Sequence, residues 1–92
     1  MTKATTNHDE KKVMNVYKIS IQDDIARIDA LVAASAKIEA CALLWGAYND
    51  YVSAIKGCVY FEHFCDICTC KQESYTVNII APLMLMYNRN EG

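Results

Sequence analysis

The feature that most constrains the fold is a run of apolar side chains in the middle of the chain, spaced alternately by three and four residues. It comprises Ile38, Cys41, Trp45, Tyr48, Val52 and Ile55. This spacing places the side chains on one face of an α-helix, because residues three and four apart are neighbours on a helix surface. Lys56 and Gly57 follow, a cation in the last turn and a glycine beyond it, as is typical of a helix end. The pattern therefore predicts an amphipathic helix over this segment.

A shorter helical pattern precedes this run. Its apolar members are Ile21, Ile25, Ile28 and Val32. Asp23 and Asp24 lie where a first turn would begin, and carboxylates suit the positive end of a helix. The phase slips near residues 34–37, so the sequence predicts either two helices or one long helix bent near Ser35.

The other segments have the composition or the period of strands. Apolar and polar residues alternate with a period of two from Tyr17 onward in segment 13–21, and again in segment 75–79. Segment 58–64 is aromatic and β-branched, which favours a strand. Pro82 cannot donate to a ladder and separates a last strand at 83–87. The predicted order is strand, helix, helix, strand, strand, strand: an α+β fold with a small antiparallel sheet of three to four strands and two helices packed on it.

Length and composition indicate one folded domain. The chain has 92 residues, which is too few for two hydrophobic cores. Residues 1–12 are polar and lack an apolar stretch, so we expect a flexible tail rather than a secretory signal, followed by a single domain at 13–92. The most apolar stretch, residues 38–55, contains too many polar residues to cross a bilayer, and the expected location is the cytoplasm.

Several classes of function are disfavoured by what the chain lacks. The net charge is −2 and the basic residues are dispersed, so no basic stripe indicates nucleic-acid binding. Its three glycines form no phosphate-binding loop. His63 is the only histidine outside the polar tail, and Asp23 and Asp24 diverge on the expected helix, so no nucleophile and base are paired. We therefore expect a protein that is not an enzyme and that uses no cofactor.

The most distinctive local cluster consists of His63, Cys65, Cys68 and Cys70. A Cys-x-x-Cys pair can place two thiolates on one zinc ion, and the other two residues could complete a tetrahedral site, with Cys58 in reserve. All four lie within eight residues, however, so a metal would crosslink little of the fold. The same cysteines also fit small apolar residues on strands, and Cys65 with Cys68 fits a redox pair.

Aromatic residues exceed what a small core can hold. Besides Tyr48, the chain carries Tyr17, Tyr51, Tyr60, Tyr75 and Tyr87, and tyrosine is enriched in protein interfaces. Lysines and an arginine near the ends of the expected elements could contact a phosphate backbone or an acidic protein patch. The candidate partner-binding residues are Lys18, Tyr51, Lys56, Lys71, Tyr75 and Arg89.

Taken over its whole length, the chain resembles phage anti-CRISPR proteins directed against type I-F systems. The resemblance runs from MTKATTNHDEKK through IEACALLWGAYNDYVSAIKG to TVNIIAPLMLMYNRNEG. It implies a non-enzymatic inhibitor in the host cytoplasm that binds the guide-RNA-loaded surveillance complex, called Csy or Cascade. Such an inhibitor would contact the Cas7 backbone or the Cas8–Cas5 tail, with the guide RNA backbone within reach, and block binding or hybridisation of target DNA.

Two alternatives remain open from the sequence. The first is a small zinc-binding module that uses the Cys65, Cys68 and Cys70 cluster. The second is a structural protein that self-associates through apolar surface. Neither a membrane nor a small-molecule substrate is expected as a partner.

Overall fold

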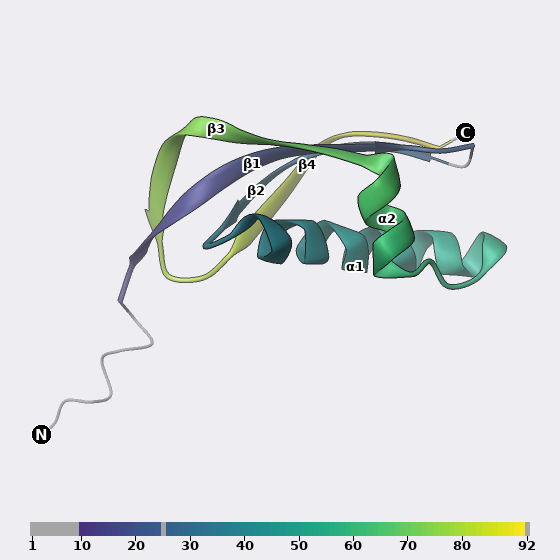
Figure 1. Cartoon of the computed structure of the whole chain (residues 1–92), viewed down its shortest axis with the longest axis horizontal. Helices are drawn as coiled ribbons and strands as arrows, with labels where there is room; N and C mark the ends of the chain where they lie inside the picture. Colours follow the sequence, from purple (N-terminus) through teal and green to yellow (C-terminus); the bar gives the residue numbers. More distant parts are fainter. Residues whose placement is uncertain (1–9, 25, 92) are drawn as a thin grey trace, which may run out of the picture.

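The computed structural model describes residues 10–24 and 26–91, without the side chains of residues 26 and 89–91. Four strands form one antiparallel sheet in the order β3-β1-β2-β4. The elements are β1 (Lys12–Gln22), β2 (Ala26–Ala34), α1 (Lys37–Lys56), α2 (Phe61–Ile67), β3 (Cys68–Ile79) and β4 (Leu83–Glu91). Figure 1 shows that both helices lie on one side of the sheet, with α1 running along it and α2 placed between α1 and β3.

The α+β class, the small antiparallel sheet and the helix over residues 38–55 are confirmed, and the sheet has four strands where three to four were predicted. The predicted order of elements is wrong, because the chain runs strand, strand, helix, helix, strand, strand. The order is wrong because the secondary structure of two segments was predicted wrongly. The segment predicted as the first helix is strand β2, and segment 58–64, predicted as a strand, includes most of helix α2.

Strand β2 replaces the predicted first helix because its apolar side chains also alternate. Ile28, Ala30, Val32 and Ala34 are all buried and share one face of the strand. β2 is a central strand paired with β1 and β4, so both of its backbone edges are hydrogen bonded. Asp23 and Asp24 lie in the β1–β2 connection rather than in a helix turn, where aspartate is equally common.

Segment 57–60 cannot join the sheet because its backbone is held by side chains of α1. The indole Nε1 of Trp45 donates to the carbonyl of Val59 at 2.7 Å, and the amide of Val59 donates to Asn49 Oδ1 at 2.7 Å. The chain therefore turns back along α1 before α2 begins. Within α2, Phe61 and Phe64 are three residues apart and pack on α1, Phe61 edge-on against Trp45.

The core lies between the sheet and the two helices. Small side chains at its centre, Ala30 and Ala34 on β2 and Ala40 on α1, are fully buried and allow the helix to approach the strand closely. Tyr48 and Phe64 are the largest fully buried side chains, and their rings pack against each other at 5.7 Å between centroids. The single amphipathic face of α1 thus meets one face of the sheet.

A polar cluster ties the end of α1 to the β1–β2 connection. The buried hydroxyl of Tyr48 donates a hydrogen bond to the carboxylate of Asp23. Lys56 Nζ lies 3.2 Å from the same carboxylate and 3.8 Å from Asp24. Burial first, and then the Asp23 carboxylate, raises the pKa of Tyr48 above its usual value, so the phenol stays protonated as a donor.

Asp29 on β2 is a buried carboxylate on the face of the sheet opposite the helices. Asn88 Nδ2 on β4 donates to it at 2.7 Å, Arg27 Nε donates at 3.3 Å, and Ser20 is its partner on β1. The hydrogen bond from Ser20, followed by Asn88 and Arg27, lowers the pKa of Asp29 despite the opposing effect of burial. This carboxylate therefore links three strands.

Both edge strands carry irregularities in pairing. Tyr17 pairs with Gln72 and Asn15 with Thr76, so β3 spans four residues where β1 spans two. A second register shift separates Asp29 from Ala30 in the pairing of β2 with β4. Each shift increases the local twist of the sheet.

The predicted tail, residues 1–12, lies outside the described residues except for its last three, and β1 begins at Lys12. In the part of the chain that the structure covers, no helix is long and apolar enough to span a membrane.

Replacing Tyr48 with phenylalanine tests the link between α1 and the hairpin. Tyr48→Phe removes a buried donor to a carboxylate, which we expect to lower the free energy of unfolding by about 1.5–3 kcal/mol in urea denaturation. Tyr60→Phe removes an exposed hydroxyl and is the matched control, with no expected change. Equal effects of the two variants would contradict the assigned role of Tyr48.

Asp29 predicts a loss of stability in acid. The pKa of Asp29 is lower in the folded state than in the unfolded state, where it is about 3.9. Its ionised carboxylate therefore stabilises the fold above about pH 3.9, and this stabilisation is lost as the pH falls through the pKa of the folded state. We expect Asp29→Asn to be less stable than wild type at pH 7 and to lose less stability between pH 7 and pH 3. Thermal unfolding across that range measures the difference, and Asp50→Asn at an exposed site should follow the wild-type profile.

Candidate functional site

The face of the sheet opposite the helices, which we call the open face, carries an apolar patch of its own. Val16 on β1 pairs with Ala33 on β2, and both are buried although neither belongs to the helix-covered core. Longer side chains from the edge strands surround them and remain exposed. Leu83 is 62% and Leu85 60% exposed.

This patch encloses a shallow hollow of about 210 Å³. All of its lining residues are apolar apart from a tyrosine hydroxyl: Val16, Leu31, Ala33, Tyr75, Val77, Ile79, Leu83 and Leu85. They come from all four strands, so the patch exists only in the folded sheet. Exposed apolar surface gathered in this way is typical of sites that bind another macromolecule.

A second hollow of about 440 Å³ adjoins the patch and is more polar. It is lined by Lys18, Leu31, Lys71, Glu73, Tyr75 and Tyr87. Lys18 and Lys71 are direct cross-strand partners, which places two like charges side by side. Within the described residues neither lysine forms an ion pair. This end of the open face therefore favours an anionic group on a partner.

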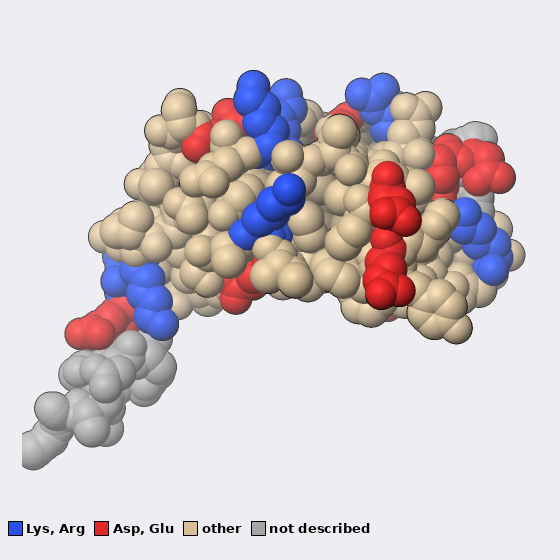
Figure 2. Space-filling view, in the orientation of Figure 1, with Lys and Arg blue, Asp and Glu red and all other residues tan. Residues whose placement is uncertain are grey.

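Charged side chains are distributed unevenly over the surface. Figure 2 shows basic side chains on the sheet side of the molecule, with some acidic side chains beside them. Acidic side chains gather over α2 in the same view, where Glu62 and Asp66 are exposed one helical turn apart. The surface over α2 is thus acidic, whereas the sheet side carries charges of both signs.

The structure brings together three of the six predicted partner-binding residues. Lys18, Lys71 and Tyr75 line the same hollow, although Lys18 lies more than fifty residues before the other two in the sequence. Tyr51 packs partly buried against the core from α1, and Lys56 is held by Asp23 and Asp24.

Arg89 was the sixth predicted residue. It lies in β4, and its side chain is outside the described part of the chain.

Sequence reasoning missed the leucines of β4. Segment 83–87 reads Leu-Met-Leu-Met-Tyr, so it is apolar on both faces of the strand. A strand at the edge of a two-layer fold has only one face against the core, and its other face must be exposed or covered by a partner. Met84 packs on the helix-side core, whereas Leu83 and Leu85 face the open side. An edge strand that is apolar on both faces was therefore the sequence feature that could have indicated a second apolar surface.

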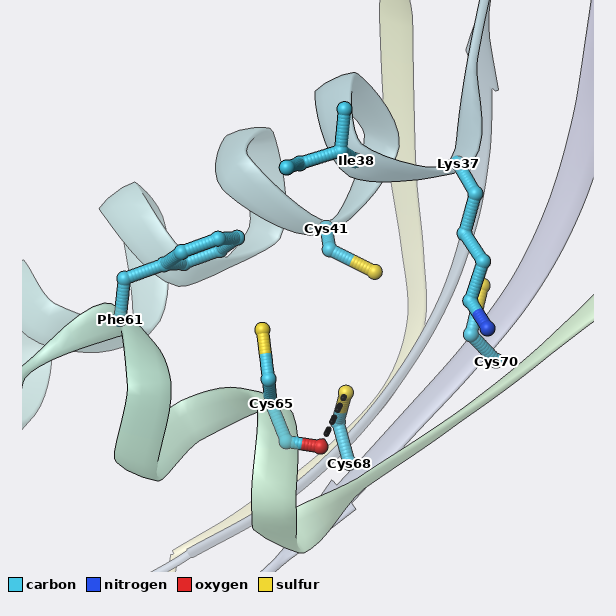
Figure 3. A pocket seen from close by; sticks show the side chains of 7 residues that line it. All are labelled: Lys37, Ile38, Cys41, Phe61, Cys65, Cys68 and Cys70. Carbon is cyan, nitrogen blue, oxygen red and sulfur yellow. Dashed lines mark hydrogen bonds between the residues drawn. The ribbon is translucent and has the colours of Figure 1, made fainter.

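A separate pocket of about 390 Å³ lies between α1, α2 and β3. Its lining comprises Lys37, Ile38, Cys41, Phe61, Cys65, Cys68 and Cys70. Figure 3 shows the side chains of Cys41 and Cys65 directed into the space between the two helices and β3. The structure thus groups three of the predicted cysteines with Cys41, which the sequence placed only on the core face of the helix.

The thiols of Cys65, Cys68 and Cys70 are protonated at neutral pH, because their pKa values are raised. Burial, followed by the neighbouring Cys41, raises the pKa of Cys68 to about 11 and that of Cys70 to about 12. The same two causes raise the pKa of Cys65, and the charge of Lys37 acts in the opposite direction. Cys68 Sγ also donates to the carbonyl of Cys65 at 3.8 Å, a long sulfur hydrogen bond. Such thiols are poor nucleophiles as they stand.

The other predicted metal ligands lie elsewhere. His63 is exposed on α2 and does not line the pocket, and Cys58 is exposed in the segment before α2. Among residues 10–24 and 26–91, no three histidine, cysteine, aspartate or glutamate side chains are arranged closely enough to hold a metal ion together.

In comparisons with known proteins, no protein-family model, no curated protein and no solved structure matches the chain.

Proposed function

We propose that this protein is a non-enzymatic inhibitor that binds a type I-F CRISPR surveillance complex through its open face and blocks binding or hybridisation of target DNA. The observation that carries the binding mode is the apolar patch on the open face. Leu83, Leu85 and Tyr75 are each at least half exposed and line the same hollow. Buried in an interface, side chains of this size contribute about 1.5–3 kcal/mol each.

The neighbouring lysines support an extended contact. Lys18 and Lys71 border the apolar patch and carry charges that no described residue pairs. An acidic protein surface or the guide RNA backbone would supply the complementary charge. The apolar patch would then provide affinity, and the lysine pair would orient the inhibitor on its partner.

The identity of the partner depends on the resemblance to anti-CRISPR proteins over the length of the chain. That resemblance supports the Cas7 backbone or the Cas8–Cas5 tail as the bound surface and the host cytoplasm as the location. The open face supports a binding protein independently of which complex is bound.

Mixing the chain with guide-loaded type I-F complex tests the proposal. We expect co-elution in size-exclusion chromatography and loss of target DNA binding in a mobility-shift assay. Leu83→Thr/Leu85→Thr keeps residues with high strand propensity but removes apolar area, and Lys18→Glu/Lys71→Glu reverses the paired charge. Each double variant should weaken binding by about tenfold or more, since loss of a few kcal/mol at an interface core has this effect.

Matched controls separate the open face from the rest of the surface. Ile55→Gln removes an exposed apolar side chain from α1, and Lys11→Glu reverses an exposed charge before β1; both should bind like wild type. Absence of co-elution would contradict the type I-F assignment. Co-elution that all variants retain would contradict the open face as the interface. Concentration-dependent self-association that the double leucine variant abolishes would favour the structural protein instead.

A further inference from the structure

The cysteine pocket and the open face share no lining residue. A binding site in this pocket therefore does not depend on the proposed inhibitor function. Four of the five cysteines of the chain line this one pocket, contributed by α1, α2 and β3. Ile38 and Phe61 form most of the remaining wall and make it largely apolar. Cys58 alone lies outside and is exposed.

Within the pocket, Cys41 and Cys70 differ from the other two thiols. Cys41 is buried on α1 and lines the pocket together with Cys70 of β3, and the nearby Cys41 thiol helps to raise the pKa of Cys70. Cys68 also lines the pocket, but its thiol donates to the carbonyl of Cys65. Cys65 is exposed at the end of α2. The thiols of Cys41 and Cys70 are therefore the pair available to a ligand inside the pocket.

The arrangement suits an ion that needs two ligands. Tetrahedral zinc sites require four, and no three candidate ligands are suitably arranged among the described residues. Copper(I) is a soft ion that thiolates select, and it accepts two sulfur ligands in a nearly linear arrangement.

Charge favours the same ion. Two thiolates and one monovalent cation leave a net charge of −1 within the pocket. Lys37 lies in the pocket lining, and its charge acts on Cys70, so it would balance that complex. A divalent ion with two thiolates would form a neutral complex, which would leave the positive charge of Lys37 without a counter-charge in the pocket.

We propose that Cys41 and Cys70 form a two-thiolate site for copper(I), with Lys37 balancing the charge of the complex. Binding breaks two S–H bonds, forms two Cu–S bonds and releases two protons to solvent, and no oxidation or reduction occurs. The pocket is wider than a bare ion, so a small-molecule copper donor can reach the buried Cys41.

The test is a competition between the fully reduced full-length chain and a coloured bidentate copper(I) chelator, under nitrogen. We expect the chain to withdraw one equivalent of copper(I) from the chelator. Cys41→Ala and Cys70→Ala should each weaken copper binding by at least about tenfold. Cys58→Ala, the exposed cysteine outside the pocket, should bind like wild type, and so should Cys68→Ala.

Each alternative outcome overturns a defined part of the proposal. Failure to compete with the chelator, or equal binding by Cys41→Ala, removes the copper site. Equal losses in Cys68→Ala and Cys70→Ala contradict the assigned pair. Tight binding of Zn²⁺ alone that survives in Cys41→Ala favours a zinc site at Cys65, Cys68 and Cys70. If circular dichroism shows that Cys41→Ala does not fold, Cys70→Ala and Lys37→Gln decide, since both sites are at least partly exposed and Lys37→Gln should weaken binding without altering the fold.

Discussion

The close packing of α1 on β2 is the contact on which the rest of this structure depends. Ala30 and Ala34 on the strand and Ala40 on the helix are fully buried, so the helix can lie near the sheet and bury Tyr48 and Leu44. Because both helices are on that side, one sheet face receives nearly all of the core (Figure 1). The open face, with its exposed leucines and tyrosines, is the direct counterpart of this one-sided arrangement.

The amphipathic helix could be predicted from sequence because its period is strict over six side chains. Strand β2 could not, since Ile28 and Val32 are compatible with both a helical step of four and a strand step of two. Pairing with β1 and β4 decided between them, and pairing is a long-range property. The strand expected at 58–64 failed for a similar reason: Trp45 and Asn49, from an earlier element, hold the backbone of Val59.

The candidate sites were predictable in part. Lys18, Lys71 and Tyr75 were identified individually as partner-binding residues, yet their meeting in one hollow required the register of β1 with β3. The cysteine cluster was identified by its spacing, but the formation of α2 turned His63 outward, and the docking of α1 brought in Cys41. Local spacing thus indicated the chemistry, while the partners of each group were set by contacts between distant elements.

The irregular pairing of the two outer strands has a consequence for how other chains can attach. A regular outer strand offers an uninterrupted row of amide and carbonyl groups onto which another chain can extend the sheet. In β3 the extra residues between Gln72 and Thr76 interrupt that row, and the register shift opposite Asp29 interrupts it in β4. Sheet extension and ordered stacking of copies into fibrils are both hindered by such breaks. The protein can therefore keep the apolar patch of its open face exposed while the irregular edge strands hinder polymerisation.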